Sequence, residues 1–314
     1  MKVKSDILFS TLVEQYLNDM QHRLREDTMV TKRYLVDLKI TPYFKNLKVN
    51  DINTITIRNW QNKLLEYKDE NGNPYKDTYL ATINNQMSAI MNYAVKHYGL
   101  LQNPCRLAGS IGKGKADEMT IWTEDQFKKA QFYEKKSGYR VAFDILFYSG
   151  LREGELLALT PADILPSKQI DVNKTFHVIK GVEKVGPPKT PRSIRKVAIP
   201  DFLYKEITEY IGKLYGIEND ERIFIVTKHG LGKELHSLAE KSGNPDIRVH
   251  DLRHSHASLL ISKGVSLVEI SRRLGHEKIK TTADTYGHLY PNEDPDIASM
   301  LESTASRKPK KKKA

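Results

Sequence analysis

The sequence predicts a multidomain α and α+β protein, in which a bundle of α-helices precedes a mainly helical domain with a small antiparallel sheet. The chain has 314 residues, more than one hydrophobic core usually organises. Apolar residues recur at helical spacing over 9–107, whereas β-branched runs appear only within 169–199. Between these regions, 108–119 (AGSIGKGKADEM) lacks periodicity and is rich in Gly and small polar residues. It predicts an exposed linker between domains 1–107 and 120–306.

Four helices are expected in the N-terminal domain. The residues that repeat at helical spacing are Leu12, Val13, Tyr16, Leu17 and Met20, and then Ile57, Trp60, Leu64 and Leu65. Helix starts are predicted at the capping residue types Ser10, Thr28 or Thr31, Thr54 and Asp77. Gly99, followed by Pro104, is expected to end the last helix.

The second domain is expected to open with two helices. Thr123 and Gln126 form a capping box, and a further helix runs through VAFDILFYS to Gly150. The runs QIDV, TFHVI and SIRKVAI then predict a small antiparallel sheet, in which GVEKVGPPKTPR forms one long hairpin loop. After 201, four more helical segments are predicted: DFLYKEITEYIGKLYG, HDLRHSHASLLISKG, SLVEISRRLG and KTTADTYGHLY.

Composition indicates a soluble protein of a reducing cytoplasm, with no membrane partner. Hydrophobic residues make up 39% of the chain, and no apolar run reaches the length that spans a bilayer. The first ten residues, MKVKSDILFS, hold too short an apolar stretch for a signal peptide. A single cysteine, Cys105, rules out an intramolecular disulfide framework.

The charge balance is typical of a protein that binds a polyanion. The formal net charge is +11, of which the basic tail 307–314 supplies 6, leaving 11 − 6 = +5 on the rest of the chain. Each phosphate that a cation neutralises releases condensed counterions, so nucleic acid is the leading partner. Charge alone leaves a merely basic soluble protein equally open. A lysine run at a terminus is usually solvated, and we assign this tail no chemistry.

Five segments of the second domain carry the chemistry. They are SGLREGELLAL at 149–159, PPKTPRSIRK at 187–196, HDLRH at 250–254, LGH at 274–276 and TTADTYGH at 281–288. In this order the series resembles the phage and transposon integrases, a branch of the tyrosine recombinases. The resemblance covers essentially the whole chain and implies a SAM-like core-binding bundle followed by a catalytic domain. It also implies site-specific cleavage and rejoining of DNA through a 3′-phosphotyrosine, without metal or cofactor, to integrate or excise a mobile element.

The resemblance places six catalytic residues on this chain. They are Arg152, Lys189, His250, Arg253, His276 and the nucleophile Tyr286, with Glu155 expected to orient Arg152. Two guanidiniums can bind the non-bridging oxygens of a phosphate, which suits Arg152 and Arg253. A tyrosine with a pKa of about 10 needs a proton acceptor, and His250 is our candidate. Lys189 is expected to protonate the departing 5′ oxygen, and His276 to donate a hydrogen bond to the phosphate.

Other interpretations stay open at this point. Lys184, Arg192 and Lys196 compete with Lys189, and His276 is as consistent with a structural role on spacing alone. His250 and His254 lie four apart around Asp251 and imitate HExxH, which would suit a metal-dependent hydrolase. Arg253 opposes that interpretation, because it would place a permanent cation beside the metal. A non-catalytic DNA-binding protein of the same fold and a topoisomerase are further alternatives.

The resemblance also implies partners. These are double-stranded DNA core sites, a homotetramer on DNA in which part of 292–306 docks into a neighbouring protomer, and DNA-bending or excision factors. Many integrases carry a further N-terminal domain for distant arm sites, so this chain is expected to belong to a simpler subgroup or to be a piece of a longer protein. Helix placement suggests DNA contacts in the bundle from Lys32, Arg33, Thr78 and Asn84.

Overall fold

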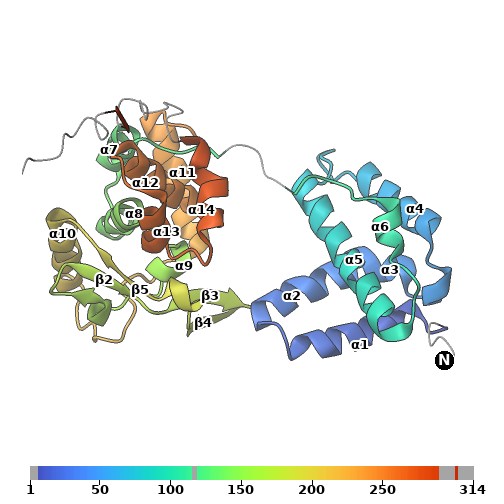
Figure 1. The fold of residues 1–314 in the computed structure, drawn as a ribbon. Coiled ribbons are helices and arrows are strands. Elements are labelled where there is room, and N and C mark those ends of the chain that lie inside the picture. The colour runs from blue at the N-terminus through green and yellow to red at the C-terminus, as the bar shows by residue number, and fades with distance from the viewer. Residues whose placement is uncertain (1–5, 115–118, 290–300, 303–314) are drawn as a thin grey trace, which may run out of the picture. The chain divides into compact units, whose positions relative to one another are not determined.

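A computed structural model describes residues 6–114, 119–289 and 301–302. The chain divides into two compact units, one of residues 1–118 with 178–182 and one of 119–177 with 183–314. Figure 1 shows a helical first unit and a second unit that combines helices with short strands, which confirms the predicted fold class. Within the described ranges, no helix combines the length and apolarity needed to cross a membrane. The basic tail and nearly all of 292–306 lie outside the described residues.

The N-terminal unit is built from more elements than the four expected helices. They are α1 (Phe9–Gln21), α2 (Glu26–Leu35), the π-helical turn η1 (Val36–Ile40), α3 (Thr41–Phe44), the 3-10 turn η2 (Val49–Asp51), α4 (Thr54–Glu66), α5 (Asp77–Tyr98) and α6 (Pro104–Ala108). Asn53 caps α4 by accepting from two backbone N–H groups, and Gly99 ends α5 with φ 71°. A core that includes Trp60, Met87 and Ile90 holds these helices together.

The expected linker is not exposed over its whole length. Gln61 donates to the Gly109 carbonyl at 2.8 Å, and Asn84 donates to the Ser110 hydroxyl at 3.4 Å. Gly112 has φ 72°, and a Cβ there would lie 2.1 Å from the Asp77 carbonyl oxygen. The first part of 108–119 therefore packs on the N-terminal unit, because buried amides and a close backbone approach hold it there. Residues 115–118 lie outside the described part of the chain.

The second unit has eight helices in its described residues. They are α7 (Glu124–Tyr133), α8 (Ser137–Ser149), α9 (Glu153–Leu156), α10 (Asp201–Gly212), α11 (Lys228–Ser242), α12 (Val249–Ser262), α13 (Leu267–Leu274) and α14 (Ile279–Tyr286). The predicted capping box opens α7: Thr123 N–H donates to Gln126 Oε1 at 2.8 Å, and Gln126 N–H donates to Thr123 Oγ1 at 3.3 Å. The short turns are η3 (Pro161–Asp163), η4 (Pro191–Ser193) and η5 (Gly287–Leu289).

The strands form two antiparallel groups instead of one sheet. Strands β1 (Ile164–Leu165), β2 (Gln169–Val172) and β5 (Arg195–Ala198) form a sheet in the order β1-β2-β5, with Ile170 opposite Val197. Strands β3 (Thr175–Ile179) and β4 (Val182–Gly186) form a separate pair. The segment expected as one long loop thus contains a strand. Lys180 and Gly181, with φ 51° and 80°, make the tight turn between β3 and β4.

Candidate active site

The LGH segment ends α13 in a Schellman turn. Gly275 adopts φ 67°, its N–H donates to the Arg272 carbonyl at 3.1 Å, and the His276 N–H donates to the Ser271 carbonyl at 3.1 Å. A Cβ on Gly275 would lie 3.0 Å from the Arg192 carbonyl oxygen, so both the conformation and the space favour glycine. The turn leaves the next three carbonyls, those of Arg273, Leu274 and Gly275, without helical partners.

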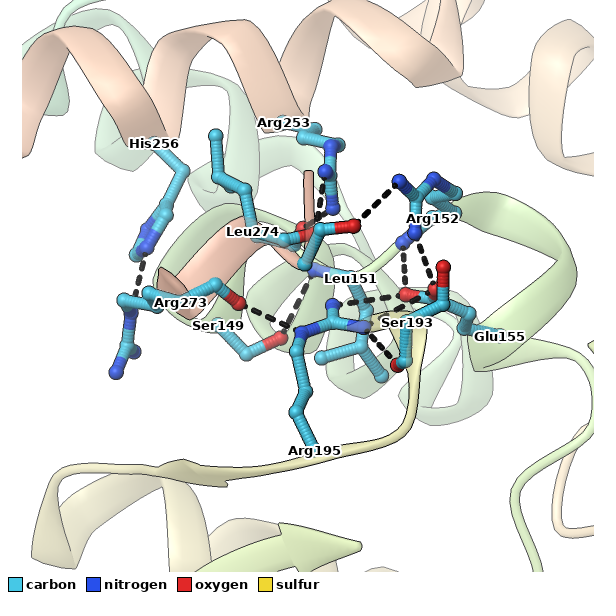
Figure 2. Close-up of polar contacts among 12 residues, drawn as sticks. Ser149, Leu151, Arg152, Glu155, Ser193, Arg195, Arg253, His256, Arg273 and Leu274 are labelled. Carbon is cyan, nitrogen blue, oxygen red and sulfur yellow. Dashed lines mark hydrogen bonds and ion pairs between the residues drawn. The ribbon is translucent and has the colours of Figure 1, made fainter. Parts of the chain in front are cut away.

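Each of these three carbonyls accepts a hydrogen bond from a different arginine (Figure 2). Arg195 Nε donates to the Arg273 carbonyl and Arg253 Nη2 to the Leu274 carbonyl, both at 2.6 Å, and Arg152 Nη2 donates to the Gly275 carbonyl at 3.3 Å. The carboxyl end of a helix carries partial negative charge, which favours guanidinium groups. The end of α13 therefore gathers arginines from β5, from α12 and from the residue before α9.

Glu155 on α9 holds two of these arginines together. Its carboxylate is 2% exposed, pairs with Arg152 Nη1 at 2.7 Å and accepts two hydrogen bonds from Arg195, at 2.9 and 3.1 Å (Figure 2). Burial by itself would raise the pKa of the Glu155 carboxyl, but the hydrogen bonds and charge of Arg195, and then Arg152, bring it below its usual value. Glu155 is thus an ionised anchor for Arg152, as expected, and also for Arg195, which sequence reasoning missed.

Arg253 is almost wholly enclosed, whereas Arg152 is open to solvent. Arg253 is 2% exposed, and besides the Leu274 carbonyl it donates to the Gly150 carbonyl at 2.7 Å. Burial, and then the nearby charge of Arg152, lowers the pKa of Arg253 to about 9, so its guanidinium stays charged at neutral pH. Within the described part of the chain, the Leu274 and Gly150 carbonyls take two of its five N–H bonds and leave three for a ligand such as a phosphate. The Arg152 side chain is 35% exposed, which leaves part of it accessible.

A buried histidine, His256, holds the side chain of Arg273, whose carbonyl accepts from Arg195. His256 is 2% exposed, its Nε2 accepts from Arg273 Nε at 2.9 Å, and its Nδ1 therefore carries the proton that it donates to the Phe147 carbonyl at 2.7 Å. Burial, with the charge of Arg273, lowers the pKa of His256 to about 3, which keeps the ring neutral. A Cβ on Gly150 would lie 2.5 Å from the His256 ring, so glycine is required beside it.

Tyr286 lies at the end of α14 with its hydroxyl against a histidine of α12. The side chain is 1% exposed and packs with Ala257, Ile261, Ile270 and Leu274. His254 Nδ1 is 2.6 Å from the Tyr286 hydroxyl oxygen. Burial raises the pKa of Tyr286 to about 12, while the charge of Arg253 acts in the opposite direction. The nucleophile candidate is therefore a neutral phenol whose hydrogen bond runs to His254.

Among the described contacts, His250, the expected proton acceptor, touches His254 but not Tyr286. Its ring lies edge-on to the ring of His254, with the centroids 4.9 Å apart. His250 keeps an exposed face, and partial burial together with the charge of Arg253 lowers its pKa. His250 and His254, four residues apart on α12, share one face, so the sequence was compatible with either histidine facing the tyrosine.

His276 points its Nδ1 at the hydroxyl of Thr282, 2.8 Å away. Burial, and then the charge of Arg253, lowers the pKa of His276 to about 4, so the ring is neutral at pH 7. The Thr282 hydroxyl can donate to Nδ1, which leaves the ring proton on Nε2 for an acceptor such as a phosphate oxygen. This arrangement fits the role expected for His276.

Lys189 is exposed and lies on the segment between β4 and η4. The same segment reaches the site further along, because Arg192 Nη1 donates to the Glu277 carbonyl at 2.6 Å. Lys189 is thus three residues from a contact with the loop that carries His276. Its role as the proton donor stays a prediction.

The four residues expected to contact DNA in the N-terminal unit differ in their exposure to solvent. Asn84 is 4% exposed and accepts a hydrogen bond from Gln61 at 2.9 Å, so it belongs to the core and its selection as a surface contact was wrong. Lys32 is half-buried and donates to Tyr16 and Gln86 at 2.8 and 2.7 Å. Arg33 is exposed and Thr78 is half-buried, so contacts from these two residues stay predictions.

His250 borders a surface pocket of about 580 Å³ that the sequence did not reveal. Basic side chains on its wall come from the start of α11 and from the residue before α12. The lining includes Glu153, Lys228, His229, His236, Arg248 and His250. In the described ranges of the chain, no three His, Cys, Asp or Glu side chains gather as metal ligands, so His250 and His254 find no third ligand there.

The chain joins a helical domain to an α+β domain, and the second of these brings together two arginines, three histidines and a buried tyrosine. This fold and this site define the class of tyrosine recombinases. Residues 8–65 match the N-terminal SAM-like domain of phage integrases, and residues 123–293 match the phage integrase family. The chain is 30% identical over 312 residues to the ICEBs1 integrase of Bacillus subtilis (strain 168), an alignment that covers 94% of this chain and 83% of that protein. The chain belongs to the phage integrase family.

Solved structures share the fold. The Tn1549 transposon integrase in complex with transposon right end DNA superposes with a TM-score of 0.76, at 17% identity, over 96% of this chain and 100% of that one. A lambda integrase tetramer bound to a Holliday junction gives a TM-score of 0.66, at 15% identity, over 92% of this chain and 79% of that one.

Proposed function

We propose that this protein, as a site-specific tyrosine recombinase, cleaves and rejoins DNA with Tyr286 as its nucleophile. The observation that carries the proposal is the buried Tyr286 hydroxyl, hydrogen-bonded to a histidine, within the electrostatic reach of Arg253. Arg152 and Arg253 bind the non-bridging oxygens and offset the charge of the pentacoordinate transition state. The Tyr286 oxygen bonds to phosphorus as the bond to the 5′ oxygen breaks, and Lys189 gives that oxygen its proton.

The products of this step are a 3′-phosphotyrosine and a free 5′ hydroxyl. A 5′ hydroxyl from a partner strand attacks the phosphotyrosine, releases Tyr286 and rejoins the DNA without ATP, because the energy of the phosphodiester is kept in the covalent intermediate. His276 donates a hydrogen bond to the phosphate during both steps. This chemistry requires no metal, and the cations that it needs come from the chain itself.

The substrate of the proposed reaction is a pair of double-stranded core sites, joined or separated when a mobile element integrates or is excised. The similar Tn1549 integrase was solved on transposon end DNA, and the similar lambda integrase as a tetramer on a Holliday junction; both support this proposal. We extend it to a homotetramer on DNA, assisted by DNA-bending or excision factors. The reaction takes place in the cytoplasm of a bacterium.

A nicked suicide substrate tests the covalent step. Cleavage next to a nick releases a short fragment that diffuses away, so the protein–DNA adduct accumulates and is visible on a denaturing gel. We expect an adduct with the unchanged protein and none with Tyr286→Phe. Phenylalanine keeps the buried ring, so the variant should retain its circular dichroism spectrum and its affinity for DNA.

The same assay separates the alternatives. Absence of an adduct on every candidate site, despite tight DNA binding, would favour a non-catalytic DNA-binding protein of this fold. Activity that EDTA removes and zinc restores would favour a metal-dependent hydrolase that uses His250 and His254. Relaxation of supercoiled plasmid with no dependence on a paired site would favour a topoisomerase.

A further inference from the structure

His254 is not one of the six residues to which the resemblance assigns catalysis, yet its Nδ1 is hydrogen-bonded to the Tyr286 hydroxyl. The two atoms are 2.6 Å apart, at the short end for a hydrogen bond to a hydroxyl oxygen. The rings are tilted by 55° with their centroids 5.6 Å apart, so the contact is made through Nδ1 and not through ring stacking. A proton can pass directly between Tyr286 and His254 at this separation.

The neighbours of His254 leave it able to take up a proton. Partial burial, followed by the closeness of His250, lowers the pKa of His254 to about 4, so its ring is neutral before the reaction. The carboxylate of Asp251, one turn earlier on α12, accepts hydrogen bonds from Arg248 Nε at 3.0 Å and Nη2 at 2.8 Å, and its negative charge acts to raise the pKa of His254. A neutral imidazole that faces a phenol has one nitrogen free to accept.

We infer that His254 is a catalytic residue that accepts the Tyr286 proton through Nδ1 when the phenol oxygen bonds to phosphorus. The inference rests on the proposed role of Tyr286. The phosphorus–O5′ bond breaks in the same step, and its electron pair stays on the 5′ oxygen, which is protonated separately by Lys189. When the DNA is rejoined, His254 returns the proton to the departing phenol oxygen, so the enzyme ends in its starting state.

Substitution of His254 should slow covalent attack without preventing DNA binding. We expect His254→Ala to reduce the single-turnover rate of adduct formation on the nicked substrate by roughly a hundred- to ten-thousand-fold. His254→Asn places an amide near the position of Nδ1 and can keep the hydrogen bond, but it cannot take a proton. The asparagine variant should therefore fold normally and lose a similar share of the rate. Full activity of His254→Asn would overturn the inference, because it would reduce His254 to a positioning residue.

A more acidic phenol at position 286 tests the proton transfer itself. Replacing Tyr286 by 3,5-difluorotyrosine lowers the need for a base, so it should restore much of the rate lost in His254→Ala. His250→Ala is the matched control from the same face of α12, and fluorination should restore less of its loss. The opposite pattern, rescue of His250→Ala and none of His254→Ala, would return the proton to His250 and overturn the inference.

The two proton transfers can be told apart with a second substrate. A sulfur atom in place of the scissile 5′ oxygen leaves without a proton, so it should rescue Lys189→Ala but not His254→Ala. Rescue of His254→Ala by this 5′-phosphorothiolate would assign His254 to the leaving group and contradict the inference. Failure of the proposed function is distinct from all of these outcomes, since it appears as the absence of any adduct with the unchanged protein.

Discussion

At the scale of single residues, Arg195 makes four hydrogen bonds within the site but has no assigned part in the chemistry. It donates to both oxygens of the buried Glu155 carboxylate, to the Arg273 carbonyl and to the Ser193 carbonyl at 2.9 Å. Only a planar guanidinium can reach acceptors in these directions at once, which makes lysine a poor replacement. Arg195 is a positioning residue: it fixes Glu155, and Glu155 fixes Arg152.

We predict that Arg195→Met destabilises the second unit by about 3 kcal/mol, because it leaves the buried Glu155 carboxylate short of donors. Adduct formation should fall as well, because Arg195 no longer holds Glu155, the partner of Arg152, in place. Urea unfolding and the suicide-substrate assay measure the two effects. Arg23→Met is the control: its pair with Asp19 is exposed, so the change should cost less than about 1 kcal/mol.

A double-mutant cycle tests whether Arg195 acts through Glu155. If it does, Arg195→Met combined with Glu155→Gln should cost clearly less than the sum of the two single changes. Simple additivity would show that Arg195 stabilises the fold by its backbone contacts alone and has no particular part in placing Arg152.

The sequence predicted which residues of the site to consider, but not how they pair. Arg152, Arg253 and His276 meet around the end of α13 because their motifs lie on segments that the fold brings together. Motif spacing could not show that His254 faces Tyr286, since the two belong to different helices. Arg195 was missed for a similar reason: in sequence it is one more cation of a basic segment, and only burial distinguishes it.

At the scale of secondary-structure elements, a buried carboxyl between α8 and α10 makes the packing of this unit sensitive to pH. Asp144 on α8 is 9% exposed, and burial, followed by the charge of Glu206 on α10, raises its pKa to about 7. A carboxyl whose pKa is raised on folding binds its proton more tightly in the folded state. The stability from this group is therefore greatest below about pH 4 and is lost as the pH rises through 7.

We predict that Asp144→Asn removes this dependence. The variant should be more stable than the unchanged protein at pH 8, by on the order of 3 kcal/mol, and nearly equal to it at pH 4. Urea unfolding of the second unit at the two pH values measures the difference. Asp220→Asn, a change at an exposed position, should show no such trend. An Asp144→Asn advantage that is the same at both pH values would mean that ionisation is not its source.

Elements with strong local signals were predicted well, and those without were missed. The Thr123 capping box begins α7 and Gly150 ends α8, both as expected. Helix α11 was missed because Gly230 and Gly232 near its start lower helix propensity, so burial of its apolar face must stabilise it. Strand β4 was missed because only two of its five residues, Val182 and Val185, are β-branched, so pairing with β3 must stabilise it.

At the scale of the whole molecule, the length of the chain predicted two cores, and the structure has separate groups of buried apolar residues in its two units. One group, in the first unit, includes Trp60, Met87 and Ile90. The second unit holds a large group that includes Phe143 and Leu203, and a smaller one around Tyr286. Among the described residues, none belongs to more than one of these groups. Length and composition could not predict that the first part of the expected linker packs on the first unit, because that depends on hydrogen bonds from the amides of Gln61 and Asn84.

Separate cores predict separate unfolding. Met87 and Leu203 are both fully buried, so truncation of either to alanine should cost about 2–5 kcal/mol. In calorimetry of the DNA-free protein we expect two transitions: Met87→Ala should lower the temperature of one, and Leu203→Ala that of the other. A single transition that both substitutions lower equally would contradict this, because it would mean that the units unfold as one cooperative body.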